Sequence, residues 1–271
     1  MALCEVLYKN QPLRLSYELG GFFASKNEAS NELDCDKNEA SNEGSLLLVL
    51  HGWGADKTLL KPLAKSICNK INARYLLLDL PGFGQSQEPN FAFSSIHYQE
   101  VIELFLLKLK LEPSMLLGHS FGGKLACMLA AKGSVKMLAI LSASGLPQKK
   151  RLSVKLKIKA TKALKALGLG ALGSIFKSKD AKGQSALMYE VLKRVVDEDL
   201  SLLLPKVKAQ KTLVFWGEKD EAVSLSSGEL FAKLIPNASF KALAGDHFFF
   251  LNQEELVAKA FAQGFLDLEQ S

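Results

Sequence analysis

Five short, almost uniformly apolar runs recur along this 271-residue chain, at residues 46–50, 75–78, 115–117, 136–141 and 212–216. A strand that is apolar at every position is buried on both faces, which is typical of a parallel sheet. Helical patterns follow most of these runs. The alternation predicts an α/β fold: a mostly parallel central sheet with helices on both faces.

The remaining elements fit around this sheet. Alternating apolar and polar residues predict two strands over 3–19, joined by a turn at residues 9–12. Apolar residues at helical spacing predict helices over 56–69, 124–131, 226–234 and 254–265. Another helix is expected to run from a cap at Ser94 or Ser95 to about Leu111, and a short strand over 239–243.

A polar stretch interrupts the pattern before the first apolar run. The seven residues Lys-Asn-Glu-Ala-Ser-Asn-Glu occur at 26–32 and again at 37–43, as expected of a duplication within a surface loop. Glu32, Asp34 and Asp36 are conceivable calcium ligands. Their spacing lacks the glycine and the terminal glutamate of an EF-hand loop, so a solvated loop is the favoured interpretation.

The net charge of +6 is unevenly distributed. Residues 148–211 hold 16 of the 34 Lys and Arg residues but only five of the 28 Asp and Glu residues. We therefore divide the chain into a first core part (1–147), a basic helical cap (148–210) with a helix near 186–196, and a second core part (211–271). A lid with a solvated outer face is the favoured interpretation of the cap; a surface for anionic substrates, membranes or carrier proteins is second, and nucleic-acid binding is least favoured because no motif accompanies the charge.

Several classes of protein are disfavoured. The first residues show no signal-peptide pattern, and no apolar run approaches the roughly 18 residues that cross a bilayer. The Gly-x-Gly at 82–84 lacks the third glycine and the following helix of a dinucleotide site. The cysteines show no metal-binding or redox spacing and are interpreted as free thiols: Cys4, Cys35, Cys68 and Cys127. We expect a cytoplasmic protein without cofactor or metal.

The run at 115–117 leads into Gly118-His-Ser-Phe-Gly122, and a helical pattern follows at once. Strand, tight turn and helix form the context in which Gly-x-Ser-x-Gly acts as a nucleophile elbow. The turn would hold Ser120 in a strained conformation that lifts its Oγ above the sheet. The motif also occurs by chance, so its interpretation as a nucleophile elbow depends on whether the chain offers a base, an acid and oxyanion donors.

A serine nucleophile needs a base, and the chain has four histidines. His119 should diverge from Ser120 across the turn, and His97 lies at the polar start of a helix. His51 is better suited to order its own loop. His247 follows a late strand in a Gly-Asp-His turn that can fold over the sheet edge, so it is the favoured base.

The base needs a carboxylate that fixes its tautomer. Asp220 follows the preceding strand and gives the chain order Ser120, Asp220, His247, the order of the Ser-Asp-His triad that accompanies such an elbow. Asp246 is adjacent to His247 in sequence, so its carboxylate should be poorly oriented toward the imidazole. The fallback acids are Glu218 and Glu221.

The developing oxyanion needs two backbone donors. The N–H of Phe121, at the start of the helix, is the first candidate. The second is the N–H of Trp53 in His51-Gly-Trp-Gly54, although its ring is equally suited to packing. Four residues are predicted to contact substrate: His51, Gly52, Trp53 and His119.

Five ordered motifs resemble those of the α/β-hydrolase superfamily: His-Gly-Trp-Gly (51–54), Asp-Leu-Pro-Gly-Phe-Gly-Gln-Ser (79–86), Gly-His-Ser-Phe-Gly-Gly (118–123), Trp-Gly-Glu-Lys-Asp (216–220) and Gly-Asp-His (245–247). The resemblance runs from residue 13 to 265 and is greatest to the esterase, carboxylester-hydrolase and meta-cleavage-product hydrolase branches. A serine at the elbow argues against the dehalogenase and epoxide-hydrolase branches, which use aspartate. The duplicated loop and the basic cap depart from the pattern.

The resemblance implies hydrolysis of a small to medium carboxylic ester through an acyl-enzyme. Thioester cleavage and carbon–carbon cleavage of a 2-hydroxy-6-oxo-dienoate are alternatives. The latter needs a cationic group for the substrate carboxylate, with Arg151 or Arg194 as candidates. A non-catalytic ligand-binding protein on the same fold is the remote alternative.

Overall fold

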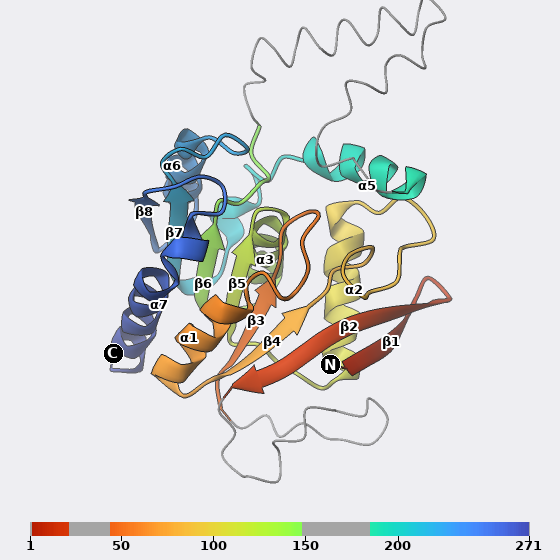
Figure 1. The fold of residues 1–271 in the computed structure, drawn as a ribbon, viewed down its shortest axis with the longest axis horizontal. Coiled ribbons are helices and arrows are strands. Elements are labelled where there is room, and N and C mark those ends of the chain that lie inside the picture. Colours follow the sequence, from red (N-terminus) through yellow and green to blue (C-terminus); the bar gives the residue numbers. More distant parts are fainter. Residues whose placement is uncertain (1, 22–43, 148–184, 271) are drawn as a thin grey trace, which may run out of the picture.

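A computed structural model describes residues 2–21, 44–147 and 185–270. They form one eight-stranded sheet with the strand order β1-β2-β4-β3-β5-β6-β7-β8 (Figure 1). All neighbours from β4 to β8 are parallel, whereas β1 and β2 form an antiparallel hairpin that pairs antiparallel with β4. The strands are β1 (Ala2–Tyr8), β2 (Gln11–Gly21), β3 (Leu46–Leu50), β4 (Arg74–Leu78), β5 (Met115–His119), β6 (Val135–Leu141), β7 (Ala209–Gly217) and β8 (Ala238–Leu243). The predicted fold class is confirmed.

Helices cover both faces of the sheet and create two apolar cores. Leu47 and Val49 of β3 pack toward α1 and α7, whereas Leu48 of the same strand packs toward α2, α3 and α6. This explains why the central strands are apolar at every position. The helices are α1 (Lys61–Ile71), α2 (Ser95–Lys108), α3 (Phe121–Lys132), α5 (Ala186–Val196), α6 (Leu225–Leu234) and α7 (Glu254–Glu269), with 3₁₀ turns η4 (Leu204–Lys206) and η5 (Phe249–Asn252).

Helix α5 lies beyond the carboxyl ends of the parallel strands, at the top of Figure 1. It confirms the helix predicted near 186–196. Residues 148–184 of the predicted cap, including Arg151, lie outside the described residues. So do the duplicated loop at 26–43 with Glu32, Asp34 and Asp36, and Cys35.

The first predicted helix is wrong at its start. It begins at Lys61 rather than Asp56, because Pro62 has no N–H and fits only the first turn of a helix. Asp56 instead closes a turn of its own: its side chain accepts hydrogen bonds from the backbone N–H and the hydroxyl of Thr58.

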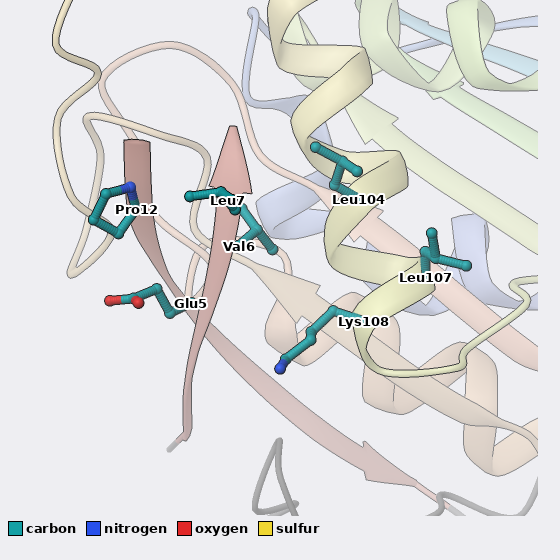
Figure 2. A pocket seen from close by; sticks show the side chains of 7 residues that line it. All are labelled: Glu5, Val6, Leu7, Pro12, Leu104, Leu107 and Lys108. Atoms are coloured by element: carbon teal, nitrogen blue, oxygen red, sulfur yellow. The ribbon is translucent and has the colours of Figure 1, made fainter. Parts of the chain in front are cut away.

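The antiparallel hairpin carries a groove of about 530 Å³ at the edge of the sheet. Figure 2 shows its two sides: one from the hairpin (Glu5, Val6, Leu7, Pro12) and one from the end of α2 (Leu104, Leu107, Lys108). None of these residues belongs to the cavity that contains the predicted nucleophile. The groove is therefore a feature separate from the candidate active site.

The three cysteines that the structure describes, Cys4, Cys68 and Cys127, are thiols rather than disulfide partners, and all are buried. Cys68 and Cys127 are fully buried, and burial raises the pKa of Cys68 to about 12 and that of Cys127 further still. Neither is poised to react as a thiolate. Within the described ranges, the helices are all too short or too polar to cross a membrane.

Candidate active site

Ser120 occupies a sharp turn between β5 and α3, with φ +51° and ψ −113°. Two glycines permit the turn. A Cβ at Gly118 would lie 2.4 Å from the carbonyl oxygen of Gly122, and a Cβ at Gly122 would lie 2.1 Å from that of Leu50. The Ser120 N–H is held by the carbonyl of Leu141 at 2.9 Å. This strained, close-packed backbone is the structure expected of a nucleophile elbow.

The loop after β3 runs directly beside the elbow. A Cβ at Gly52 would meet Nδ1 of His119 at 2.8 Å and Cβ of Ser120 at 3.2 Å, so this backbone approaches the serine as only glycine allows. Trp53 packs edge-on against Phe83 and Phe121, at ring-centroid distances of 4.8 and 5.7 Å. The ring of Trp53 therefore packs against aromatic neighbours, as predicted from the sequence.

His247 and Asp220 come together from two further loops. Nδ1 of His247 donates to Oδ2 of Asp220 at 2.8 Å, and the other carboxylate oxygen accepts the N–H groups of Ala222 and Val223 at 2.8 and 2.9 Å. Burial acts to raise the pKa of Asp220. The hydrogen bond and charge of His247, with the Val223 N–H, outweigh burial and hold this pKa below its usual value. A carboxylate therefore faces Nδ1 and leaves Nε2 available on the other side of the ring.

His119 supports the loop that carries His247. Its Nε2 donates to the backbone carbonyl of His247 at 3.0 Å, and the two rings lie 4.7 Å apart. Burial, followed by the charge of His247, lowers the pKa of His119 to about 3. The ring is neutral at ordinary pH and holds the neighbouring loop in place.

His51 lies outside the cavity lining. Its Nδ1 donates to the carbonyl of Gly52 at 2.8 Å, and its Nε2 accepts the N–H of Leu80 at 3.0 Å. Burial lowers its pKa, in keeping with a neutral ring that bonds only to backbone. The cavity lining thus contains three of the four predicted substrate contacts, Gly52, Trp53 and His119, and lacks His51.

A buried ion pair beneath this loop was not foreseen. Lys57 Nζ lies 2.6 Å from Oδ2 of Asp79 and donates to the hydroxyl of Ser16 at 2.8 Å. Oδ1 of Asp79 accepts the N–H of Lys57, and the N–H of Gln85 binds Oδ2. The only signal in the sequence is a carboxylate directly after an apolar run, in the Asp-Leu-Pro-Gly motif.

One cavity of about 320 Å³ brings together most of the predicted site residues, while Asp220 lies behind His247 and outside the lining. Its lining includes Gly52, Trp53, His119, Ser120, Phe121 and His247. Its apolar walls are Leu146, Leu192, Val195, Val196, Val223 and Phe248. The lining among the described residues contains no Asp, Glu, Lys or Arg, so the cavity suits an uncharged, apolar group.

Other candidates lie elsewhere. Arg194 donates to the backbone carbonyl of Ala92 at 3.0 Å and does not line the cavity. Glu218 and Glu221 do not line it either, and Asp246 accepts the N–H of Phe248 within its own turn. In the parts of the chain that the structure describes, no three His, Cys, Asp or Glu side chains cluster as metal ligands.

Comparisons with known proteins agree with this architecture. Residues 45–162 match the model of a family described as alpha/beta hydrolase fold. The chain is 31% identical over 105 residues to protein phosphatase methylesterase 1 of Mus musculus, covering 37% of this chain and 27% of that protein. It is 26% identical over 110 residues to the pimeloyl-[acyl-carrier protein] methyl ester esterase of Aliivibrio salmonicida, covering 41% and 40%. These matches span less than half of the relatives' lengths.

A solved structure covers nearly the whole chain. The esterase from Exiguobacterium antarcticum superposes with a TM-score of 0.69 at 20% identity, covering 96% of this chain and 98% of that one. At this identity the likeness shows the fold.

Proposed function

We propose that the chain is a serine hydrolase of the α/β-hydrolase superfamily that cleaves carboxylic esters through an acyl-enzyme. The match of residues 45–162 to an alpha/beta-hydrolase family model and the fold shared with a solved esterase support this proposal. The observation that carries the proposal is the hydrogen bond of 2.8 Å between Asp220 and His247, because His247 lines the same cavity as the strained Ser120. An oriented imidazole beside an elbow serine is the arrangement that activates a hydroxyl nucleophile.

In the first half-reaction, Ser120 Oγ attacks the ester carbonyl carbon while Nε2 of His247 takes its proton. Asp220 stabilises the resulting imidazolium through Nδ1. The N–H groups of Trp53 and Phe121 are proposed to bind the oxyanion; both residues line the cavity. Collapse of the intermediate breaks the carbon–oxygen bond, and His247 gives its proton to the leaving alcohol.

In the second half-reaction, a water molecule attacks the acyl-serine. His247 now takes the proton of the water and returns it to Ser120 Oγ as the acid product leaves. The neutral His119 donates to the carbonyl of His247 and would keep the base aligned through both half-reactions.

The cavity favours an uncharged acyl group over a dienoate carboxylate. Its described lining holds no cation, and Arg194 is bonded to the Ala92 carbonyl instead. A buried carboxylate without a cationic partner would be costly. Esters, and thioesters of the same shape, therefore fit better than the carbon–carbon substrate. We place this activity in the cytoplasm, a reducing compartment that suits the buried thiols Cys68 and Cys127.

A substrate panel tests the proposal. Wild type and Ser120→Ala are compared on p-nitrophenyl esters, acyl thioesters and a 2-hydroxy-6-oxo-dienoate. We expect turnover of neutral esters that Ser120→Ala lowers by several orders of magnitude. Faster turnover of the dienoate would establish the carbon–carbon alternative. Tight ligand binding without any turnover would establish the binding protein.

A further inference from the structure

Lys124 is a fully buried lysine in the helix that follows the nucleophile. It lies four residues after Ser120, and its N–H donates to the Ser120 carbonyl at 3.1 Å. A buried ammonium is costly unless it is paired and hydrogen-bonded. Helix formation alone does not require this lysine to be buried. The groups that pair with its ammonium therefore indicate what its burial does.

Those partners are a residue of α5 and a residue just beyond its end. Nζ of Lys124 donates to the carbonyl of Val195 at 2.6 Å and to Oε2 of Glu198 at 2.7 Å. Oε1 of Glu198 accepts the N–H of Ser95 at 3.0 Å. Val195 lies in the last turn of α5, and Ser95 is the first residue of α2.

The charges match the helix ends that they contact. The ammonium of Lys124 meets a carbonyl at the C-terminus of α5, where a positive charge is stabilising. The carboxylate of Glu198 meets an N–H at the N-terminus of α2, where a negative charge is stabilising. One ion pair thus joins the N-terminal part of α3 to the ends of two other helices.

Helix α5 is also a wall of the cavity, through Leu192, Val195 and Val196. The residue whose carbonyl Lys124 holds is therefore itself a lining residue. A second lining residue, Gly145, also lies beside Lys124: a Cβ at Gly145 would lie 3.3 Å from Cγ of Lys124. The carbonyl of Gly145 accepts a hydrogen bond of 2.7 Å from the N–H of Leu200. The Lys124 side chain thus bonds to the α5 wall and passes close to the lining residue Gly145.

We propose that Lys124 is a positioning residue that, through Val195 and Glu198, fixes the α5 wall relative to Ser120 and so sets which acyl chains fit. The inference rests on the proposed esterase function and adds a determinant of its specificity. A fixed wall gives each further methylene of the substrate a surface to bury, whereas a loosened wall does not.

The test compares Lys124→Met with the matched control Lys132→Met. Lys132 lies on the same helix, in an exposed pair with Glu103. The measurement is the ratio of kcat/KM for p-nitrophenyl octanoate to that for p-nitrophenyl acetate. We expect Lys124→Met to lower this ratio about tenfold, mainly through KM, because each methylene buried in an apolar pocket counts for that order of discrimination. Lys132→Met should leave the ratio unchanged.

Hydrogen exchange supplies a readout that does not depend on activity. Amides of α5 should exchange faster in Lys124→Met than in Lys132→Met. An unchanged ratio with unchanged α5 exchange would overturn the inference, and so would an equal loss on both esters. If Lys124→Met does not fold, Glu198→Gln removes one end of the pair and is expected to shift the ratio in the same direction. Wild-type protein without esterase activity would instead refute the proposed function, while the α5 exchange would still test the contact.

Discussion

The side chain of His119 donates a hydrogen bond of 3.0 Å to the backbone carbonyl of His247, so the residue before the nucleophile supports the loop of the proposed base. His119 is buried, and its pKa is lowered to about 3, first by burial and then by the charge of His247. The native ring stays neutral while the unfolded ring protonates near pH 6.5. Stability from this histidine is therefore present above pH about 6.5 and lost as the pH falls toward 3.

We predict that His119→Gln flattens this acid limb, because the glutamine amide keeps a donor but does not titrate. Wild type should lose roughly 1.4 kcal/mol more unfolding free energy per pH unit across this window than the variant. Urea unfolding at several pH values measures the difference. Parallel curves for the two proteins would contradict the low pKa of His119.

The acid of the proposed triad has a direct test. Asp220→Asn should lower kcat about 10⁴-fold, because an amide no longer selects the tautomer with its proton on Nδ1. Glu218→Gln is the control, since Glu218 is exposed and outside the cavity. Steady-state kinetics on one p-nitrophenyl ester compares them. A larger loss for Glu218→Gln would transfer the role to that fallback acid.

The close packing of the turn at Ser120 predicts that one added methyl group at Gly122 strongly lowers the free energy of unfolding. In Gly122→Ala the new Cβ would stand 2.1 Å from the Leu50 carbonyl, a clash with backbone that no side-chain rotation relieves. We expect a loss of about 3 kcal/mol or more in unfolding free energy. At Gly133, after the same helix, a Cβ meets nothing within 4 Å and φ is −123°, so Gly133→Ala should cost less than about 1 kcal/mol. Similar unfolding midpoints would refute this description of the elbow.

The buried Lys57–Asp79 pair should count for more than an exposed one. Lys57→Met would leave the fully buried Asp79 carboxylate without its cation, at a cost of about 3–5 kcal/mol. Lys70→Met breaks an exposed pair with Glu255 and should cost about 1 kcal/mol or less. Chemical denaturation of both variants provides the comparison. Equal losses of unfolding free energy in the two variants would show that the Asp79 carboxylate does not depend on Lys57 for its stabilisation.

Local patterns were sufficient to predict most of the fold. Apolar runs located β3 to β7, and alternation located the hairpin of β1 and β2, because burial on one or two faces leaves a direct mark on sequence. Of the two predicted caps of α2, Ser94 and Ser95, the structure has Ser94. The start of α1 was wrong because periodicity outweighed the restriction that Pro62 imposes on a helix interior.

The contacts around the candidate site were only partly predictable. Ser120, Asp220 and His247 each follow a predicted strand, so a parallel sheet was expected to gather them at one edge. Lys57 with Asp79 and Lys124 with Glu198 could not be paired in advance. They are separated by 22 and 74 positions, and a lone lysine in an amphipathic pattern reads as a solvated residue until the tertiary packing is known.

Covalent labelling by a fluorophosphonate, followed by mass spectrometry of the peptides, is the most direct test of the central claim. The account predicts one stoichiometric adduct, located on Ser120 and absent from Ser120→Ala. It also predicts much slower labelling of His247→Ala, because the base that activates the hydroxyl is lost. Labelling of a different residue, or an active protein that the reagent does not modify at Ser120, would contradict it.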